Sequence, residues 1–304
     1  MTKPSNIKRS LLLIMVLVSV SVTCQEQTSS AAGTSAKKQK TKKRKKKVKL
    51  PNIDLSHWKV TIPEGKGKGG AISVDPPEIL KYAENEVLKP FMYNDSTSGA
   101  IVFHAYPTNA TTANTKYSRS ELREQMVPGD NNVNWTFAQG GYLKAKMAME
   151  EVSRDKDGRY HKVIIAQIHG RLTNEQRDLI GQKDNNAPPI LKIYWQNGKI
   201  RVKTKELKFK GVDEKGILFK EAWKDDKGIN FEEEVGFKSF TIEVKVSDGK
   251  MLVSLNKNEF LVYDSASIRR WGIFENYFKA GNYLQTRDEG AFAKVNIYEL
   301  EVAH

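Results

Sequence analysis

The chain has 304 residues, a formal net charge of +14 and one cysteine. This length suits one large domain or two small ones, and a single cysteine excludes an internal disulfide framework. The charge is unevenly distributed, because residues 1–50 hold thirteen Lys or Arg and one acid, which leaves 37 basic and 35 acidic residues for the rest. The part after residue 50 is therefore nearly neutral, and the basic excess lies in the N-terminal segment.

Residues 1–24 have the features of a signal peptide. Positive charges at Lys3, Lys8 and Arg9 precede an apolar run at 11–22, an order typical of export signals. The run has about a dozen residues, whereas a membrane-spanning helix needs roughly 20; a short membrane anchor is the alternative. Cys24 follows a Ser-Val-Thr sequence that looks like a bacterial lipoprotein processing site. We therefore expect an exported protein, either secreted or a cell-surface or periplasmic lipoprotein held at the outer membrane by lipid on Cys24.

Residues 25–50 are expected to form a disordered, Lys-rich linker. Residues 25–36 are polar and small, and residues 37–49 hold ten Lys or Arg, a like-charge block that is normally disordered. A solvated tether is one interpretation, and attraction to an anionic surface, a polyanionic substrate or nucleic acid is the other. We expect no nucleic-acid partner, because nuclear targeting conflicts with an export signal.

Residues 51–304 are expected to form one domain built mainly of β-strands. Asn-Gly at 197–198 and Asp-Gly at 248–249 lie between β-rich runs and predict tight hairpins. A short helix that begins with proline is expected at 78–83. Strands are expected at 101–106, 116–126, 142–150, 161–169, 190–196, 199–204, 240–247, 250–255, 260–264, 271–285 and 292–302. Many short strands without regular βαβ alternation predict an all-β antiparallel β-sandwich jelly roll.

Two polar stretches, 171–189 and 206–235, interrupt the strand pattern. They are long for loops, and long loops on a sandwich are commonly functional; variable surface decoration is the alternative. Three glutamates at 232–234 are expected to lie in a solvated loop.

Three short segments carry polar residues at every second position: 119–123 (Arg-Ser-Glu-Leu-Arg), 167–169 (Gln-Ile-His) and 277–285 (Tyr-Phe-Lys-Ala-Gly-Asn-Tyr-Leu-Gln). Side chains alternate between the faces of a strand, so each segment would place its cations, amide, imidazole or phenols on one face. Taken singly, these patterns are also typical of salt-bridge ladders or amphipathic packing. Together in one β-rich chain, they predict a cleft for an anionic, hydroxyl-rich polymer.

The residue types suit β-elimination on a uronate polymer. Removal of the hydrogen beside the carboxylate places charge on that carboxylate, which Arg119 and the Gln167 amide can stabilise. His169 can donate a hydrogen bond or act as a base, and Tyr283 can transfer a proton. Lys279 and Arg123 would supply a positive field. Glu121 is expected to hold Arg119 and Arg123 in place.

At these segments the chain resembles the alginate lyases of polysaccharide lyase family 7. The likeness covers about residues 51–304 and includes the start at 54–63 (Asp-Leu-Ser-His-Trp-Lys-Val-Thr-Ile-Pro). It implies a jelly roll (concanavalin-like) whose concave sheet binds alginate, and cleavage of 1,4-glycosidic bonds that leaves a 4,5-unsaturated uronate at the non-reducing end. Ile168 in the second segment is similar to family members that accept guluronate-containing blocks, so these blocks are expected to be slightly favoured.

The resemblance also implies a role for each site residue, and no metal or other cofactor. Arg119, Gln167 and His169 would neutralise the substrate carboxylate. Tyr283 would be the acid, and also the base where proton and leaving group lie on the same side; with guluronate, His169 would be the base. The substrate-binding or supporting residues would be Glu121, Arg123, Lys279, Gln285 and Tyr277.

Other functions make different demands. A glycoside hydrolase needs two carboxylates flanking the bond, and the Glu-x-Asp-x-x-Glu strand of jelly-roll hydrolases is missing from this sequence. A non-catalytic carbohydrate-binding module needs aromatic platforms but no Tyr, His and Arg around one carboxylate. A lyase for another polyuronate is a further alternative. We expect a monomeric enzyme.

Overall fold

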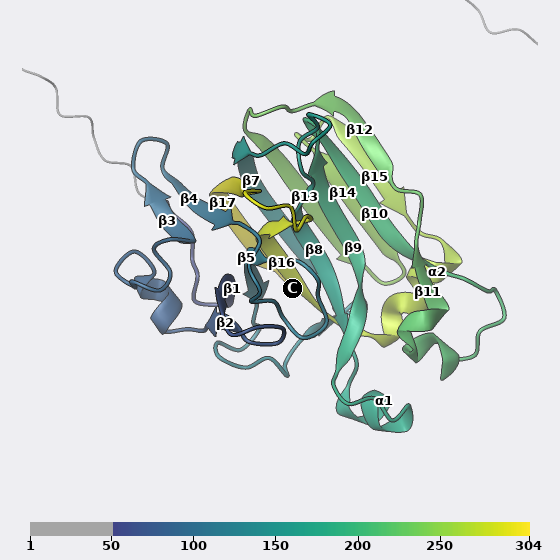
Figure 1. Ribbon diagram of the computed structural model, residues 1–304. Helices are drawn as coiled ribbons and strands as arrows, with labels where there is room; N and C mark the ends of the chain where they lie inside the picture. Colours follow the sequence, from purple (N-terminus) through teal and green to yellow (C-terminus); the bar gives the residue numbers. More distant parts are fainter. Residues whose placement is uncertain (1–50) are drawn as a thin grey trace, which may run out of the picture. The chain divides into compact units, whose positions relative to one another are not determined.

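The computed structural model describes residues 51–304, which form two antiparallel β-sheets (Figure 1). The expected signal peptide at 1–24, with Cys24, and the Lys-rich linker at 25–50 lie outside the described residues. The predicted all-β antiparallel sandwich is confirmed, because the described chain is mostly strand with only short helices. Within residues 51–304, no helix is long and apolar enough to cross a membrane.

One sheet has ten strands and the other has seven. The larger sheet contains β1 (Trp58–Gly65), β2 (Ala71–Val74), β5 (Arg119–Glu124), β6 (Trp135–Thr136), β8 (Val163–Arg171), β9 (Asn186–Gln196), β10 (Lys199–Leu207), β11 (Trp223–Asp225), β12 (Ile229–Glu234) and β16 (Glu275–Leu284). The smaller sheet contains β3 (Met92–Asp95), β4 (Ala100–Ala105), β7 (Gly141–Val152), β13 (Phe240–Ser247), β14 (Lys250–Leu255), β15 (Glu259–Tyr263) and β17 (Ala293–Ala303). The helices are α1 (Asn174–Leu179), α2 (Ala266–Arg270), and the short 3-10 helices η1 (Glu78–Lys81), η2 (Gly216–Leu218), η3 (Lys220–Ala222) and η4 (Trp271–Ile273).

The two predicted hairpins form as expected. Asn197 and Gly198 both have positive φ, 49° and 82°, which matches the twist of the flanking strands β9 and β10. The turn between β13 and β14 has Gly249 at φ 67°. β13 pairs with β14 in unbroken register from Ile242 to Ser247. Local turn chemistry therefore fixes the register of both hairpins.

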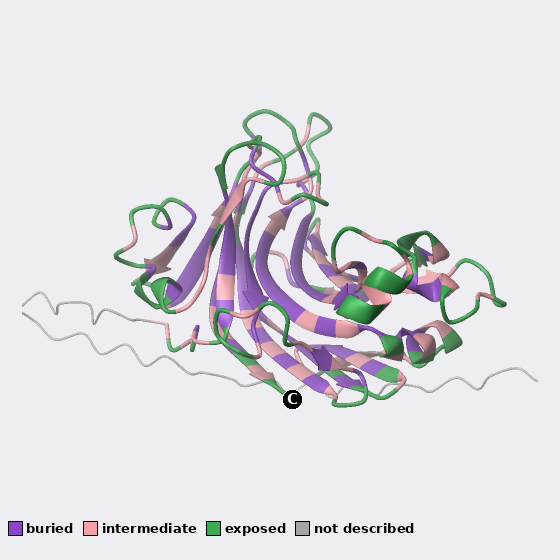
Figure 2. Ribbon diagram, turned by 90° about the horizontal axis from the view of Figure 1, so that it is seen from below, coloured by how far each residue is buried: buried purple, intermediate pink, exposed green. Residues whose placement is uncertain are grey.

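The hydrophobic core lies between the sheets. Its largest fully buried side chains include Trp58, Trp135, Trp195 and Trp271, and Figure 2 shows buried residues along the strongly curved strands. β16 is tied to the second sheet by Asn282, whose Nδ2 donates to the carbonyl oxygens of Phe103 (3.0 Å) and Ala293 (2.6 Å). The strand that carries Tyr283 is thereby fixed from behind.

The structure corrects several expected elements, among them the helix expected at 78–83, which is the 3-10 helix η1 at Glu78–Lys81. The expected strand 271–285 begins only at Glu275, because Trp271 lies in η4 and packs into the core. The three glutamates 232–234 belong to β12, which pairs with β10, and do not form a loop. The stretch 171–189 holds α1, which projects beyond the sheet at the ends of β8 and β9 (Figure 1).

Candidate active site

The three polar segments predicted from the sequence lie on adjacent strands. β16 runs between β5 and β8 in the larger sheet. Lys279 pairs with Arg123 on one side and Gln167 on the other. Tyr283 pairs with Arg119, and Tyr277 pairs with His169. Non-local pairing therefore gathers the three segments onto one face of the sheet.

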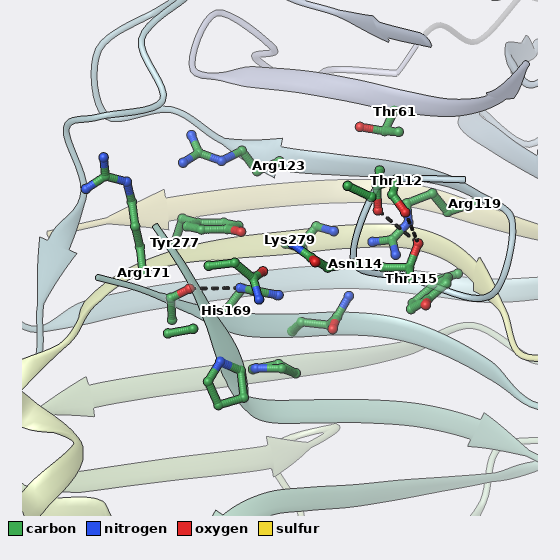
Figure 3. A pocket seen from close by; sticks show the side chains of 18 of the residues that line it. Thr61, Thr112, Asn114, Thr115, Arg119, Arg123, His169, Arg171, Tyr277 and Lys279 are labelled. Atoms are coloured by element: carbon green, nitrogen blue, oxygen red, sulfur yellow. Dashed lines mark hydrogen bonds between the residues drawn. The ribbon is translucent and has the colours of Figure 1, made fainter. Parts of the chain in front are cut away.

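This face forms the floor of a cleft of about 750 Å³ (Figure 3), a size usual for ligand sites. Its walls carry far more cations than anions, with Asp184 as the one carboxylate that lines it. The lysines and arginines that line it are Lys59, Arg119, Arg123, Arg171, Lys192, Lys220 and Lys279. A cleft with this balance attracts an anionic ligand.

Glu121 lies below the cleft floor and contacts three polar side chains of the cleft. Its carboxylate is fully buried and accepts from Arg119 Nη1 at 2.7 Å and Gln167 Nε2 at 2.6 Å, and it also pairs with Lys279 Nζ. Burial alone would raise the pKa of Glu121, but Lys279 and Arg119 hold it below its ordinary value. The carboxylate is therefore ionised and fixes the orientation of three cleft residues.

Two of the three guanidinium nitrogens of Arg119 have no hydrogen-bond partner. Its Nη1 is used by Glu121, whereas Nε and Nη2 are buried and have no partner. The guanidinium also lies 3.7 Å from the centre of the Tyr283 ring, a cation–π contact. Because an unpaired buried donor is costly, an oxyanion that reached these atoms would be bound favourably.

His169 is a neutral imidazole with a defined tautomer. Burial, and then the charge of Lys279, lowers the pKa of His169 to about 3. Nδ1 lies 2.9 Å from the carbonyl oxygen of Gly170, and a carbonyl only accepts, so Nδ1 carries the proton. Nε2 then holds a free lone pair. The ring stacks on Tyr277 with centroids 5.2 Å apart.

Tyr283 and Lys279 have opposite pKa shifts. Burial raises the pKa of Tyr283, while Arg119 opposes that rise, so the phenol keeps its proton at neutral pH. Burial, together with the nearby charge of Arg119, lowers the pKa of Lys279 to about 8. The lysine therefore becomes neutral in mildly alkaline solution.

The backbone beside Tyr283 needs glycine. Gly281 has φ +136°, and a Cβ there would stand 2.8 Å from the carbonyl oxygen of Ser120 on β5. The β16–β8 register shifts between Ala280 and Tyr283, as at a bulge. This irregularity helps to set where the phenol lies.

The structure places every predicted site residue in or beneath this cleft. Glu121 lies below the floor, and the residues that line the cleft are Arg119, Arg123, Gln167, His169, Tyr277, Lys279, Tyr283 and Gln285. The expected pairing of Glu121 with Arg123 is wrong. Arg123 instead donates to the carbonyl oxygens of Glu124 and Asn131 and to Asn134 Oδ1, while Glu121 pairs with Arg119 and Lys279.

Several cleft residues were not predicted. Arg171 continues the alternation of Gln167 and His169 by one further step, so its pattern was available in the sequence. Lys59 on β1 and the loop residues Thr112 and Asn114 also line the cleft. The loop residues follow no strand period, so no local signal marked them.

Two loops meet over the cleft. Asn114 Nδ2 donates to Asp184 Oδ2 at 3.0 Å, and both loops line the cleft. One loop leads into β5 beside Tyr283, and the other leads into β9 opposite Arg171. The contact therefore crosses above β8 and β16. Both side chains are exposed, so this single hydrogen bond is a weak closure.

Within residues 51–304, no three His, Cys, Asp or Glu side chains come together as metal ligands would.

A β-sandwich whose cleft combines several arginines, an amide, an imidazole and a phenol is a polysaccharide lyase for acidic sugars. The family described as "Alginate lyase" matches residues 53–304, so the chain belongs to this family, and it is an alginate lyase. The expected family, fold and activity are thereby confirmed.

Solved structures agree with this assignment. Alginate lyase A1-II', a member of polysaccharide lyase family 7, is 29% identical, with a TM-score of 0.65 over 83% of this chain and 96% of that chain. A variant of A1-II' in complex with the substrate GGMG is 28% identical, with a TM-score of 0.64 over 83% and 94%. The alginate lyase AlyA1 from Zobellia galactanivorans shares the fold at 19% identity, with a TM-score of 0.54 over 84% and 97%. No curated protein matches the chain.

Proposed function

We propose that the cleft cleaves alginate with Arg119 and Gln167 on the substrate carboxylate, Tyr283 as acid and His169 as base for guluronate. The observation that carries this assignment is the pair of unpartnered Arg119 donors beside a protonated phenol and a neutral imidazole. The reaction opens the 1,4-glycosidic bond and leaves a 4,5-unsaturated uronate at the new non-reducing end.

The carboxylate is bound first. Arg119 offers Nε and Nη2, and Gln167 Nε2 keeps a second hydrogen beyond its bond to Glu121. Charge moves onto this carboxylate as the neighbouring C5–H bond breaks. Donors fixed in advance around such charge are worth about 10²–10³-fold in rate for each one.

His169 takes the C5 proton of guluronate at Nε2. Its low pKa in the free protein comes from burial and from the cations Lys279 and Arg119. A bound substrate carboxylate offsets those charges, so substrate binding raises the basicity of His169. The hydrogen bond from Nδ1 to Gly170 holds the required tautomer. Neutralisation of the carboxylate by His169 would need a proton on Nε2, which this tautomer lacks.

Tyr283 completes the elimination. The electron pair of the broken C5–H bond forms the C4=C5 double bond, the C4–O4 bond breaks, and the phenol gives its proton to O4. The raised pKa of Tyr283 keeps that proton available. For mannuronate, where Tyr283 must also be the base, the phenol has to ionise first.

This difference supports a preference for guluronate-containing blocks. The free protein already has a neutral His169 and a protonated Tyr283, which is the pair that guluronate requires. Mannuronate requires a phenolate against the raised pKa of Tyr283, although Arg119 above the ring favours that anion. The preference should therefore be one of rate and should not exclude mannuronate.

The test is to incubate the purified protein with poly-guluronate, poly-mannuronate and mixed alginate, and to follow the ultraviolet absorbance of the conjugated double bond. We expect a rise on all three and the fastest rise on poly-guluronate. His169→Ala should impair the cleavage of guluronate most strongly and so reduce the ratio of the guluronate to the mannuronate rate. His104→Ala, on β4 in the other sheet, is the control. An unchanged ratio in the His169 variant would contradict its role as the guluronate base.

We further infer from the sequence that residues 1–24 direct export and that Cys24 carries lipid. The support is the charged start, the short apolar run and the Cys that follows it. Expression of the full chain with radiolabelled palmitate in a bacterial host should label the protein, and Cys24→Ser should abolish the label. Secretion of the protein without the label would contradict lipid attachment and indicate an ordinary cleaved signal peptide.

A further inference from the structure

One arginine of the cleft has no part in the chemistry described above. Arg171 is the last residue of β8 and faces the cleft two positions after His169. The residue is only 7% exposed, yet it lines the cleft. At 3.3–3.4 Å per strand residue, Arg171 lies about 7 Å beyond His169 and about 13 Å beyond Gln167. It is therefore too far along the strand to share the carboxylate that Arg119 and Gln167 hold.

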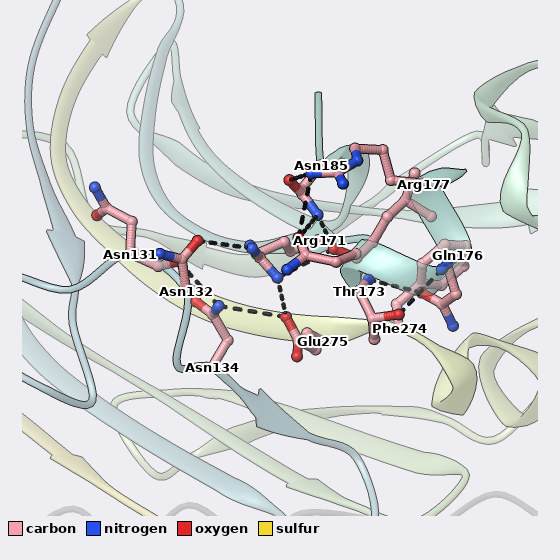
Figure 4. Close-up of polar contacts among 12 residues, drawn as sticks. Asn131, Asn132, Asn134, Arg171, Thr173, Gln176, Arg177, Asn185, Phe274 and Glu275 are labelled. Atoms are coloured by element: carbon pink, nitrogen blue, oxygen red, sulfur yellow. Dashed lines mark hydrogen bonds and ion pairs between the residues drawn. The ribbon is translucent and has the colours of Figure 1, made fainter. Parts of the chain in front are cut away.

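Arg171 is fixed by a built network of polar contacts (Figure 4). Nη1 donates to Glu275 Oε2 at 2.5 Å and to the carbonyl oxygen of Leu172 at 3.1 Å. Nη2 donates to Asn132 Oδ1 at 2.9 Å. Glu275 is also the cross-strand neighbour of Arg171 on β16. A long flexible side chain is thus held in one position at the edge of the cleft.

Arg123 is held next to it by the same short segment. Its Nη2 donates to the carbonyl oxygen of Asn131 at 3.0 Å and to Asn134 Oδ1 at 2.9 Å, while Arg171 uses Asn132 between them. Burial lowers the pKa of Arg123, and the nearby charge of Arg171 adds to that effect. Among residues 51–304, Arg123 forms no ion pair with a carboxylate. Of these two neighbouring guanidiniums, Arg171 is therefore the one that pairs with a carboxylate, Glu275, within the described chain.

We propose that Arg171, beside the expected substrate-binding residue Arg123, provides a second carboxylate-binding subsite, which receives a uronate unit next to the one that reacts. This proposal rests on the proposed function, because only a polyuronate brings a carboxylate on every unit. A planar guanidinium suits a carboxylate, and within the described chain Glu275 is the one carboxylate that pairs directly with either guanidinium. Arg171 is here a binding residue and takes no part in proton transfer.

A purely structural role is the rival explanation. Arg171 donates to Leu172 at the start of the segment that carries α1, so it also holds that segment in place. The two roles differ in what they do to substrates of different length. Loss of a subsite weakens the binding only of substrates long enough to reach it. Displacement of the α1 segment would instead disturb the binding of substrates of every length.

The experiment measures kcat and KM of Arg171→Gln on a series of guluronate oligomers of increasing length, with ultraviolet detection of the double bond. We expect KM to rise about tenfold or more on long oligomers, the cost of one hydrogen bond to a charged group, with kcat unchanged. The shortest oligomer that is cleaved should show no change. The KM of the variant on long oligomers should also depend less on salt than that of the wild type.

Three controls keep the test decisive. Arg177→Gln alters another arginine of the same segment that does not line the cleft, and it should leave KM unchanged at every length. If Arg171→Gln folds poorly, the double variant Arg171→Gln, Glu275→Gln replaces the ion pair with a neutral one and should show the same length dependence. Arg171→Lys keeps the charge without the planar fork and should show an intermediate KM.

A fall in kcat/KM of equal size at every length, or no change at any length, would overturn the second subsite. Failure of the wild-type protein to form the double bond would instead overturn the proposed function. The two failures are therefore distinguishable in one set of assays.

Discussion

Two glutamates on strand β5 are both buried, yet they lie on opposite faces of the sheet and have opposite surroundings. Glu121 faces the cleft and is surrounded by Arg119, Lys279 and Gln167. Glu124 faces the core, where its Oε2 accepts from Trp135 Nε1 at 3.0 Å and from the Phe278 amide at 2.8 Å. The first carboxylate organises groups that await a substrate, and the second satisfies groups that have no other partner.

The difference shows how one strand separates activity from stability. Around Glu121, Arg119 keeps two unpartnered donors, so the hydrogen bonds on this face are all made only when an anion binds. Around Glu124, Oε1 pairs with His304 Nε2 at 2.7 Å, and the His304 ring packs on Trp135. The polar groups around Glu124 already have their partners within the protein. Substitutions at the two positions should therefore affect different measurements.

Among the substitutions that test this comparison, the largest effect is expected for Glu121→Gln. The amide cannot hold Lys279 and Arg119 as a carboxylate does, and the pKa of Lys279, already lowered to about 8, falls further without Glu121. We expect kcat/KM on poly-guluronate to fall about 10²–10³-fold, as for loss of a fixed transition-state donor. Steady-state kinetics at neutral pH measures this. Full activity in the variant would mean that Glu121 does not organise the cleft.

A smaller and pH-dependent effect is expected for Lys279→Arg. In the wild type, Lys279 is charged below about pH 8 and neutral above it, so kcat/KM should decline as the pH rises through that value. Arginine stays charged, so the decline should move to higher pH. The pH profile of kcat/KM reports the free enzyme. If the pH profiles of the wild type and the variant coincide on the alkaline side, another group causes the decline. Where turnover is too weak to measure, calorimetric titration with a guluronate oligomer compares the pH dependence of binding instead.

Glu124→Gln should change stability and leave activity alone. The substitution removes a charge-assisted hydrogen bond to His304, worth about 1.5–3 kcal/mol of the free energy of unfolding. Urea denaturation of the variant measures this loss, and kcat/KM of the folded fraction should equal that of the wild type. A drop in kcat/KM without a drop in stability would reverse the roles assigned to the two glutamates.

The smallest effect is expected for His304→Ala. Burial alone would lower the pKa of His304, but Glu124 raises it above its ordinary value of 6.5. A raised pKa stabilises the fold below the unfolded value, and this contribution is lost as the pH rises through the folded value. The loss of stability in the variant should therefore be about 1.5 kcal/mol in acidic buffer and smaller in alkaline buffer. Equal losses in both would attribute the effect to ring packing alone.

Strand periodicity made much of the fold and the cleft predictable. Alternation in 119–123 and 277–285 placed Arg119, Lys279 and Tyr283 on faces that the structure confirms. The partners of Glu121 could not be predicted, because they depend on which strands are neighbours and in what register. For the same reason nothing local revealed Glu124, whose partner His304 is 180 residues away.

The loops were the least predictable part. Asn114 and Asp184 meet over the cleft from segments 70 residues apart, and neither segment has a strand or helix period. Arg171 is a different case, since alternation from Gln167 and His169 extends to it. The expected strand 161–169 ends two residues before β8 does, so Arg171 falls in the stretch that is expected to be a loop.

The most direct test of the account is the turnover of Tyr283→Phe on poly-guluronate, measured by ultraviolet absorbance alongside alginate binding. The phenol is the one group assigned to protonate the leaving oxygen, and loss of a positioned acid costs about 10²–10⁴-fold in rate. Tyr298→Phe on β17, in the other sheet, is the matched control. We predict that Tyr283→Phe folds, binds alginate and forms almost no double bond. Turnover near that of the wild type would contradict the role of Tyr283.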